Sequence, residues 1–200
     1  MTRRSRSEMI AETRAKLIAA ARKAFGEQGY AEASMDDFTA AAGLTRGALY
    51  HHFGDKKGLL EAVVQQIDAE MAERLKAISA AARTPWEGFV QENIGYVEMA
   101  LEPEIQRILL RDGPAVLGDP SLWPSADACI ATIRKNVEDL QDAGLIRNDI
   151  DAEAVARLIS GASMDAALWI ANAADPRSVS GKALPVFKAL LEGLLRREAA

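Results

Sequence analysis

Cysteine and histidine are scarce in this chain of 200 residues, and their scarcity excludes several kinds of site. Cys129 is the only cysteine, so no intrachain disulfide can form and nothing implies an oxidising compartment. The two histidines, His51 and His52, are neighbours; on a helix they point about 100° apart and cannot bind one metal ion together. Ala48 and Leu49 stand three residues before them, where a di-iron helical bundle needs Glu. We therefore expect neither a metal site nor a di-iron enzyme.

Long hydrophobic runs and catalytic signatures are also missing. No stretch approaches the ~18 apolar residues that span a membrane, and the basic residues 1–6 lead into an amphipathic pattern. We therefore expect a cytoplasmic protein with no membrane partner. The sequence contains no glycine-rich phosphate loop, nucleophile elbow or suitably spaced carboxylate pair. An enzymatic activity and a cofactor are not expected.

The formal net charge of −5 argues weakly against a nucleic-acid partner, but the charges are unevenly distributed. Residues 1–58 contain ten Lys and Arg against seven Asp and Glu, a net charge of +3. Residues 59–200 contain fourteen against twenty-two, a net charge of −8. Only the first segment is suited to face phosphate.

Almost every periodic segment has the three-to-four-residue spacing of apolar side chains that is typical of helices, and alternating Val, Ile and Thr are missing. Capping residues, glycines and prolines mark the expected helix ends. The sequence predicts an all-α protein of about nine helices, near residues 8–27, 34–42, 45–53, 55–84, 84–100, 102–112, 119–144, 151–173 and 180–197. Gly113 and Pro114 are expected to break the chain after the sixth helix, and Pro185 obscures the start of the ninth.

Residues 34–57 carry the most informative motif, two short helices joined by a tight turn, as in a helix-turn-helix. Gly43 supplies the positive φ that the turn requires, and Leu44 fills the corner. The side chains expected to face the first helix are those of Met35, Phe38, Ala42, Leu49 and Phe53. Those left outside on the second short helix are Thr45, Arg46, Gly47, Tyr50 and His51. They form a small polar surface that fits a DNA major groove about 12 Å wide.

In order and without gaps, this region resembles the DNA-binding domain of the TetR (tetracycline-repressor) family. The resemblance rests on Gly29-Tyr30, Ser34-Met35-Asp36, Ala42-Gly43-Leu44-Thr45, Gly47-Ala48-Leu49-Tyr50, His52-Phe53, Asp55-Lys56 and Leu59. It implies that Thr45 caps the recognition helix and contacts a phosphate, that Arg46 reads base edges, and that Gly47 permits close approach to the duplex. Further implied DNA contacts come from Tyr50, His51, Lys56 and the backbone amides of Ser34 and Met35.

The sequence departs from the family pattern at Thr39, which stands where the two short helices cross and where a smaller residue is usual. Its hydroxyl is expected to bond to the carbonyl of Met35. Lys57 stands where an acid is usual, which adds positive charge beside Lys56. Neither departure is expected to prevent DNA binding.

The resemblance further implies a DNA-binding domain of residues 1–55 and a ligand-binding and dimerisation domain of residues 56–200. In the family, helices four to seven enclose a cavity for a small-molecule effector. The large or adaptable side chains that are candidates for lining it are those of Trp86, Phe89, Tyr96, Met99, Trp123, Cys129, Ile133, Met164 and Trp169. Packing in an ordinary core is the competing interpretation for each one. Arg107 and Arg111 either receive a ligand carboxylate or pair with Glu104 and Asp112 at the surface, and we expect the surface pairs.

The last two helices are implied to pair with those of a second subunit. The expected interface residues are Leu158, Ile159, Ala162, Ala166, Ile170, Phe187, Leu191, Leu194 and Leu195, which a monomer would expose. A homodimer presents two recognition helices, so the double-stranded DNA partner is expected to be a palindromic operator. The sequence thus predicts a transcriptional regulator, a repressor released by an unidentified small molecule. The alternative is a helical sensor or scaffold whose N-terminal head binds protein rather than DNA.

Overall fold

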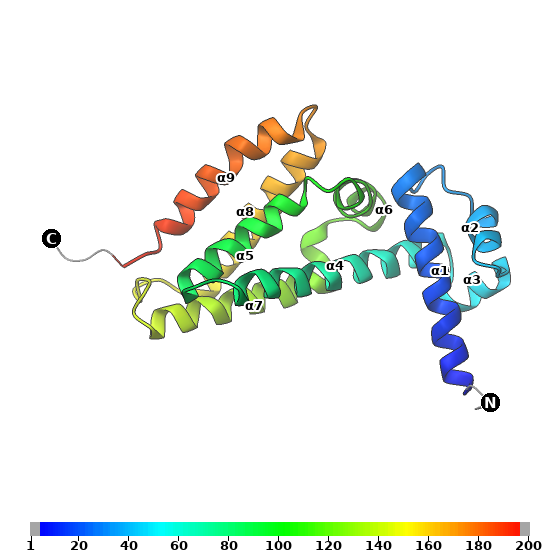
Figure 1. The fold of residues 1–200 in the computed structure, drawn as a ribbon, viewed down its shortest axis with the longest axis horizontal. Helices are drawn as coiled ribbons and strands as arrows, with labels where there is room; N and C mark the ends of the chain where they lie inside the picture. Colours follow the sequence, from blue (N-terminus) through cyan, green and yellow to red (C-terminus); the bar gives the residue numbers. More distant parts are fainter. Residues whose placement is uncertain (1–4, 197–200) are drawn as a thin grey trace.

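The computed structural model describes residues 5–196, and in that range it confirms the all-α prediction. The elements are α1 (Arg6–Gln28), α2 (Met35–Ala41), α3 (Arg46–Phe53), α4 (Lys56–Ala80), α5 (Pro85–Met99), the π-helix η1 (Ile105–Asp112), α6 (Gly113–Leu117), the 3₁₀ turn η2 (Pro120–Leu122), α7 (Pro124–Asp142), α8 (Ala152–Asn172) and α9 (Pro176–Glu192). The molecule is elongated, with α1 to α3 at one end (Figure 1). We call α1 to α3 the head, and α5 to α9 with the second half of α4 the body.

The head is held together by a small apolar core beneath α1. Phe25 and Leu49 are fully buried there, and the Phe25 ring contacts the rings of Tyr30 and Phe38 with centroids 5.5 and 5.9 Å apart. The Thr39 hydroxyl donates a 2.7 Å hydrogen bond to the carbonyl of Met35, as the sequence predicts. This bond satisfies the hydroxyl of Thr39, which is buried at the crossing of α2 and α3.

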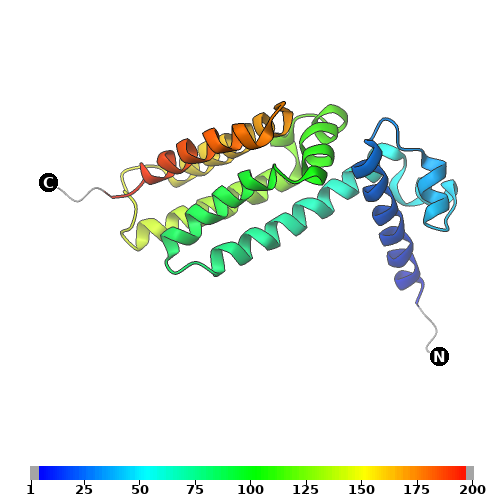
Figure 2. The same ribbon diagram turned by 45° about the horizontal axis from the view of Figure 1, so that its top comes forward.

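Helix α4 connects the head to the body. Its first turns pack against α1 and α3, and its later turns pack against α5 (Figure 2). The closest approach is at Gly58, where an added Cβ atom would lie 2.1 Å from the carbonyl oxygen of Phe53 at the end of α3. Only glycine fits this position, so the end of α3 rests directly on the first turn of α4.

The body is a bundle in which α8 is central, because it packs against α5, α7, α9 and η1. Helix α8 is also long and apolar enough to cross a membrane, a test that the core helix of a soluble protein passes equally well. Its side chains Val155, Ile159 and Ile170 are buried among the other helices of the body. The central place of α8 in the bundle accounts for these buried side chains, whereas Leu158 and Trp169 of the same helix are exposed.

Three predicted helix boundaries are wrong, each at a proline. Gly113 and Pro114 do not break the chain, because η1 continues directly into α6 with Pro114 in its first turn, where the missing N–H costs little. Pro120 opens only the 3₁₀ turn η2, and the long helix α7 begins at Pro124. The ninth helix begins at Pro176 behind the capping side chain of Asp175, so Pro185 lies inside it rather than near its start.

Candidate functional site

The turn between α2 and α3 has the local geometry that its sequence predicts. Gly43 has a φ of +67°, and the N–H of Leu44 donates to the carbonyl of Thr39 at 2.9 Å. The Thr45 hydroxyl caps α3 by accepting the N–H of Ala48 at 3.3 Å. These contacts orient the first turn of α3 away from α1, toward solvent.

The outer face of α3 carries the residues that the resemblance assigns to DNA. Gly47, Tyr50 and His51 are exposed there, and the Arg46 side chain is 51% exposed. The Arg46 Nε atom lies 2.7 Å from Asp36 Oδ1 on α2, so base contact requires Arg46 to leave this carboxylate. A Cβ atom at Gly47 would meet only the hydroxyl of Thr45, at 3.6 Å, which leaves the helix surface open for a close partner.

Lys56 begins α4 beside this face. Its ammonium lies 4.5 Å from the ring centroid of Tyr30 and donates to the carbonyl of Ala31 at 3.4 Å. Partial burial lowers the pKa of Lys56, while the nearby carboxylates of Glu32 and Asp112 oppose that shift. Lys56 is the first residue of α4, so its charge adds to the positive end of the helix dipole.

The N-terminus of α2 is less suited to a phosphate than the sequence analysis expects. The Ser34 hydroxyl caps this helix by accepting the N–H of Asp37 at 3.3 Å, and the side chain of Met35 is partly buried. Asp36 and Asp37 place negative charge in the first turn. These carboxylates repel a phosphate at the amides of Ser34 and Met35. The repulsion is weaker while Arg46 neutralises Asp36.

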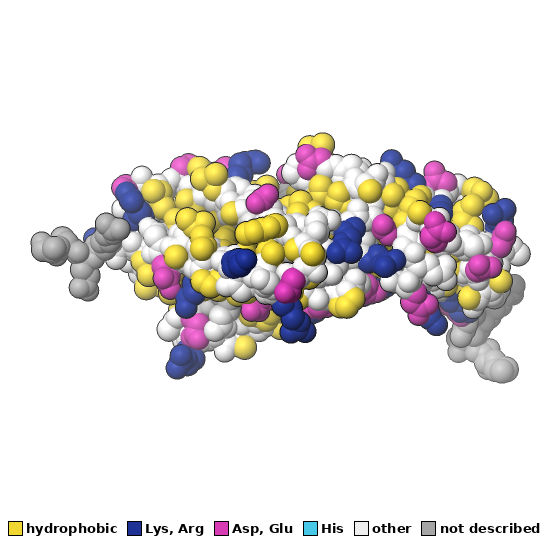
Figure 3. Space-filling model, turned by 90° about the horizontal axis from the view of Figure 1, so that it is seen from above, with side chains coloured by type: hydrophobic (Ala, Val, Ile, Leu, Met, Phe, Trp, Pro, Cys, Tyr) yellow, Lys and Arg dark blue, Asp and Glu magenta, His cyan; other side chains and the backbone are white. Residues whose placement is uncertain are grey.

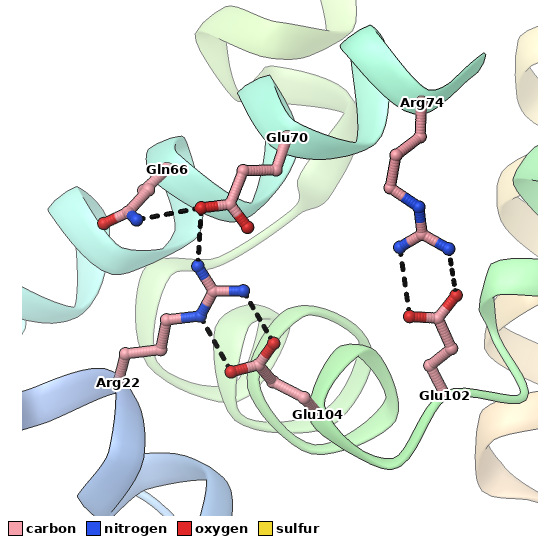
Figure 4. A network of polar contacts seen from close by, with 6 residues as sticks. All are labelled: Arg22, Gln66, Glu70, Arg74, Glu102 and Glu104. Carbon is pink, nitrogen blue, oxygen red and sulfur yellow. Dashed lines mark hydrogen bonds and ion pairs between the residues drawn. The ribbon is translucent and has the colours of Figure 1, made fainter. Parts of the chain in front are cut away.

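Ion pairs join the head to the body (Figure 4). Arg22 on α1 binds both carboxylate oxygens of Glu104 at 2.7 and 2.8 Å and one oxygen of Glu70 on α4 at 2.7 Å. A second bidentate pair, within the body, joins Arg74 on α4 to Glu102. A cleft of about 540 Å³ at this junction is lined by Ala19, Arg22, Lys23, Gly26, Glu27, Gln66, Pro103 and Glu104, none of which is among the predicted pocket residues.

The π-helix η1 contacts the head and α8 at the same time. The N–H of Tyr30 donates to Asp112 Oδ2 at 2.7 Å, and Arg111 Nε donates to the carbonyl of Ala171 at 2.9 Å. The predicted surface pairs of Arg107 and Arg111 with Glu104 and Asp112 are wrong for the described residues, since Arg22 binds both oxygens of Glu104 and the Arg111 guanidinium bonds to the Ala171 carbonyl. A π-helical turn inside a helical segment is often found at functional sites.

The predicted pocket residues fall into three groups. Buried in the body are Phe89, Met99 and Ile133. Partly buried and packed against the core are Trp86, Tyr96, Trp123 and Met164. Cys129 keeps an exposed surface, and Trp169 lies more than half exposed on the outside of α8, away from the interior that the prediction assigns to it.

The sequence analysis did not identify a set of polar side chains that lie between α4, α5, α7 and α8. Burial raises the pKa of Asp68 and of Glu92, while Ser125 beside Asp68 and Ser79 and Asn136 beside Glu92 lower it in part; the Asn136 amide donates to Glu92 Oε2 at 3.3 Å. Both acids had a signal in the sequence, since Asp68 is four residues after Val64 and Glu92 is three after Phe89, on stripes of buried residues.

The same region also holds Tyr96 and Cys129. The Tyr96 hydroxyl lies 3.9 Å from the sulfur of Met164, and Ser160 beside the Cys129 thiol lowers the pKa of that thiol in part. Burial is the main cause that raises the pKa of each, and the Asp68 carboxylate adds to both shifts. These groups come from three helices and share one polar neighbourhood.

The predicted dimer residues divide between the core of the protomer and its surface. Ile159, Ile170, Phe187 and Leu191 are buried within the single chain, so they have little area left for a partner. Ala162, Ala166, Leu194 and Leu195 are partly buried, and Leu158 is three-quarters exposed. The large exposed side chains that the prediction missed here are Trp169, Val186 and Leu190. Figure 3 looks onto this side of the body and shows hydrophobic side chains gathered between scattered charges.

Comparison with known proteins matches both parts of the chain. Residues 17–63 match the family described as "Bacterial regulatory proteins, tetR family", and residues 86–194 match "Tetracyclin repressor-like, C-terminal domain". The transcriptional regulator CymR of Pseudomonas putida is 34% identical over 155 residues, which cover 74% of this chain and 75% of CymR. The transcriptional repressor AcnR of Corynebacterium glutamicum is 27% identical and covers 76% of this chain and 85% of its own.

A solved structure agrees with these matches over nearly the whole length. The crystal structure of a TetR-family transcriptional regulator from Pectobacterium atrosepticum has a TM-score of 0.90 and 52% sequence identity, and it covers 98% of this chain and 100% of its own. The likeness includes the head and the body together. The chain therefore belongs to the TetR family of transcriptional regulators.

Proposed function

We propose that this regulator is a cytoplasmic homodimer that represses transcription from a palindromic operator and leaves the DNA when a small molecule binds in the body. Residues 1–55 form the DNA-binding domain in this proposal, and residues 56–200 form the ligand-binding and dimerisation domain. The observation that carries it is the outer face of α3, where Arg46 and Tyr50 are exposed on a capped helix.

Charge and geometry support DNA rather than a protein as the partner of the head. The basic residues Arg46 and Lys56 are the first residues of α3 and α4. Gly47, next to Arg46, has no side chain that would keep a duplex away from the surface of α3. Major-groove recognition needs such a narrow polar helix face with a guanidinium at its start. A scaffold that binds protein through this face is not proposed, because Tyr50 is the one large exposed apolar side chain that accompanies Arg46 on the described part of α3.

Release by an effector requires that the conformation of the body and the position of the head change together. The ion pairs of Arg22 and the contacts of η1 connect the two, so a ligand that moves η1 or α4 changes the position of α3. Coupling of this kind is reciprocal, and DNA must weaken effector binding by the factor by which effector weakens DNA binding. No catalytic step is part of the proposal.

Selection of genomic fragments by the purified protein tests the proposal. We expect sequencing of the retained fragments to give a palindromic site whose half-sites lie one helical turn, or a multiple, apart. The retained fragments are also expected to compete with one another for the same surface of the protein. Failure to retain any DNA at low salt contradicts the proposed function.

Replacement of Lys56 by alanine is expected to weaken binding to all DNA sequences alike. One phosphate contact is lost per half-site, so the slope of log affinity against log salt concentration should become shallower by about 1 per head. Lys76→Ala is the matched control, because Lys76 is exposed on the same helix but in the body. Equal slopes for both variants would show that Lys56 does not face the DNA backbone.

A further inference from the structure

The interior of the body contains two carboxylates that no basic side chain neutralises. Asp68 on α4 and Glu92 on α5 are only partly exposed. Among residues 5–196, the ion pairs involve neither of them. Removing a carboxylate from water is costly unless a cation or sufficient hydrogen bonds compensate. Here the partners are neutral, namely Ser125 for Asp68 and Ser79 and Asn136 for Glu92.

The two carboxylates surround one place. Asn136 on α7 donates to Glu92 Oε2 on α5 at 3.3 Å, and the Tyr96 hydroxyl on α5 lies 3.9 Å from Met164 Sδ on α8, so Glu92 and Tyr96 face these neighbouring helices. The Asp68 carboxylate adds to the raised pKa of both Tyr96 and Cys129, and Glu92 adds to that of Cys129, which agrees with this placement. Asp68, Glu92 and Tyr96 are partly buried, and Cys129 is exposed at the edge of this group. That combination is expected of side chains that line a space enclosed by helices.

A buried hydroxyl on α8 provides an independent observation at the same place. Ser163 is only 5% exposed, and its Oγ atom has no hydrogen-bond partner among the described residues. Ser160 and Met164, its neighbours on the helix face, contact the Cys129 thiol and the Tyr96 hydroxyl. Ser163 therefore faces the region between α5 and α7. A buried hydroxyl without a partner is uncommon in proteins and leaves an acceptor for a ligand.

We propose that this place binds the protonated amine of an organic cation with an apolar body, and that this cation is the effector. Asp68 and Glu92 supply the negative charge, and Ser163 Oγ accepts a further N–H. The apolar part of the ligand is accommodated by the surrounding Met164, Tyr96 and Phe89 side chains, which are the kind that line small-molecule pockets. The inference rests on the proposed regulator function, because it names the chemistry of the molecule that the body senses.

Calorimetry with matched probes tests the charge of the ligand. Each set contains a primary amine, the alcohol of the same skeleton and the carboxylate of the same skeleton, with phenylethyl, cyclohexylethyl and n-hexyl bodies. In at least one set we expect the amine to bind the full-length dimer at least tenfold more tightly than the alcohol, and the carboxylate not to bind. If no amine exceeds its alcohol, or if a carboxylate binds best, the inference is wrong.

Isosteric variants test the residues. The double variant Asp68→Asn, Glu92→Gln should lose the amine preference by about tenfold or more, since a hydrogen bond to a charged group is worth about that factor. Its melting temperature should stay equal or rise, because two unpaired carboxylates are removed. Glu98→Gln is the matched control, since Glu98 is exposed on α5. A lower melting temperature of the double variant with unchanged amine binding would instead assign the carboxylates a structural role.

A DNA-binding assay separates this inference from the proposed function. If wild-type protein binds its selected DNA but no amine lowers that affinity, the effector chemistry is wrong and the regulator proposal stands. If the protein retains no DNA while the amine still binds to Asp68 and Glu92, the proposed function fails and the cation site stands. Release of DNA by the amine from wild type, but not from the double variant, supports both.

Discussion

Replacement of Leu190 by aspartate is expected to convert the protein to a monomer that no longer holds its operator. Leu190 is 63% exposed on α9, beside the exposed Val186, so the change does not disturb the protomer itself. In a two-fold interface each substitution occurs twice and buries two charges. The dimer dissociation constant should therefore rise by about 100-fold or more, since burying each leucine contributes about 1.5–3 kcal/mol. Operator affinity should fall by about 10²- to 10⁴-fold because the two heads are no longer linked.

Light scattering after size separation, followed by DNA titration, measures both effects. Leu122→Asp is the matched control, because Leu122 is 82% exposed in η2, away from α8 and α9. It should leave the mass and the operator affinity unchanged. A dimer of wild-type stability in Leu190→Asp would mean that the exposed face of α8 and α9 is not where the subunits meet.

Replacement of Arg46 by alanine is expected to remove sequence preference at one base pair of each half-site. A bidentate contact from arginine to guanine contributes about 1–3 kcal/mol of discrimination, and both heads lose it. The folded protein should keep its stability, because the side chain is half exposed and its surface ion pair with Asp36 contributes about 0–1 kcal/mol. Competition with operators changed at one base pair at a time should reveal the position that no longer matters.

Two further variants separate charge from recognition. Arg83→Ala removes the same charge from an 89% exposed side chain before α5 and should leave preference unchanged. Asp36→Asn releases Arg46 from its partner within the head, so DNA affinity should stay the same or rise. If Arg46→Ala lowers affinity equally for every operator variant, Arg46 contacts the backbone rather than a base edge.

Local signals in the sequence were sufficient to predict the structure of the head and most helices of the body. The turn at Gly43 and the cap at Thr45 each depend on residues within five positions of one another, so their geometry follows from residue type. The same holds for the bond from Thr39 to Met35. The boundary near Pro120 was wrong because proline opens a short 3₁₀ turn as readily as a long helix, and that near Pro185 because α9 contains this proline in its interior against the usual preference.

The parts of the site that depend on tertiary packing could not be predicted with the same detail. An apolar stripe on α9 gives no means of distinguishing Leu191, which faces its own protomer, from Leu190, which does not. The π-helical turns of η1 also leave no distinct spacing of apolar residues. Asp68 and Glu92 were visible as acids on buried stripes, but their common surroundings depend on how α4, α5 and α7 meet.

The contact at Gly58 has a mechanical consequence. Because the end of α3 rests on the backbone of α4 there, the recognition helix and the first turn of α4 move as one piece. Helix α4 has 25 residues and is thus a lever about 37 Å long. A tilt of about 5° at its far end displaces the tip by about 3 Å, close to the spacing of adjacent base pairs. A rearrangement too small to alter the core of the body is therefore large enough to take two recognition helices out of register with the duplex.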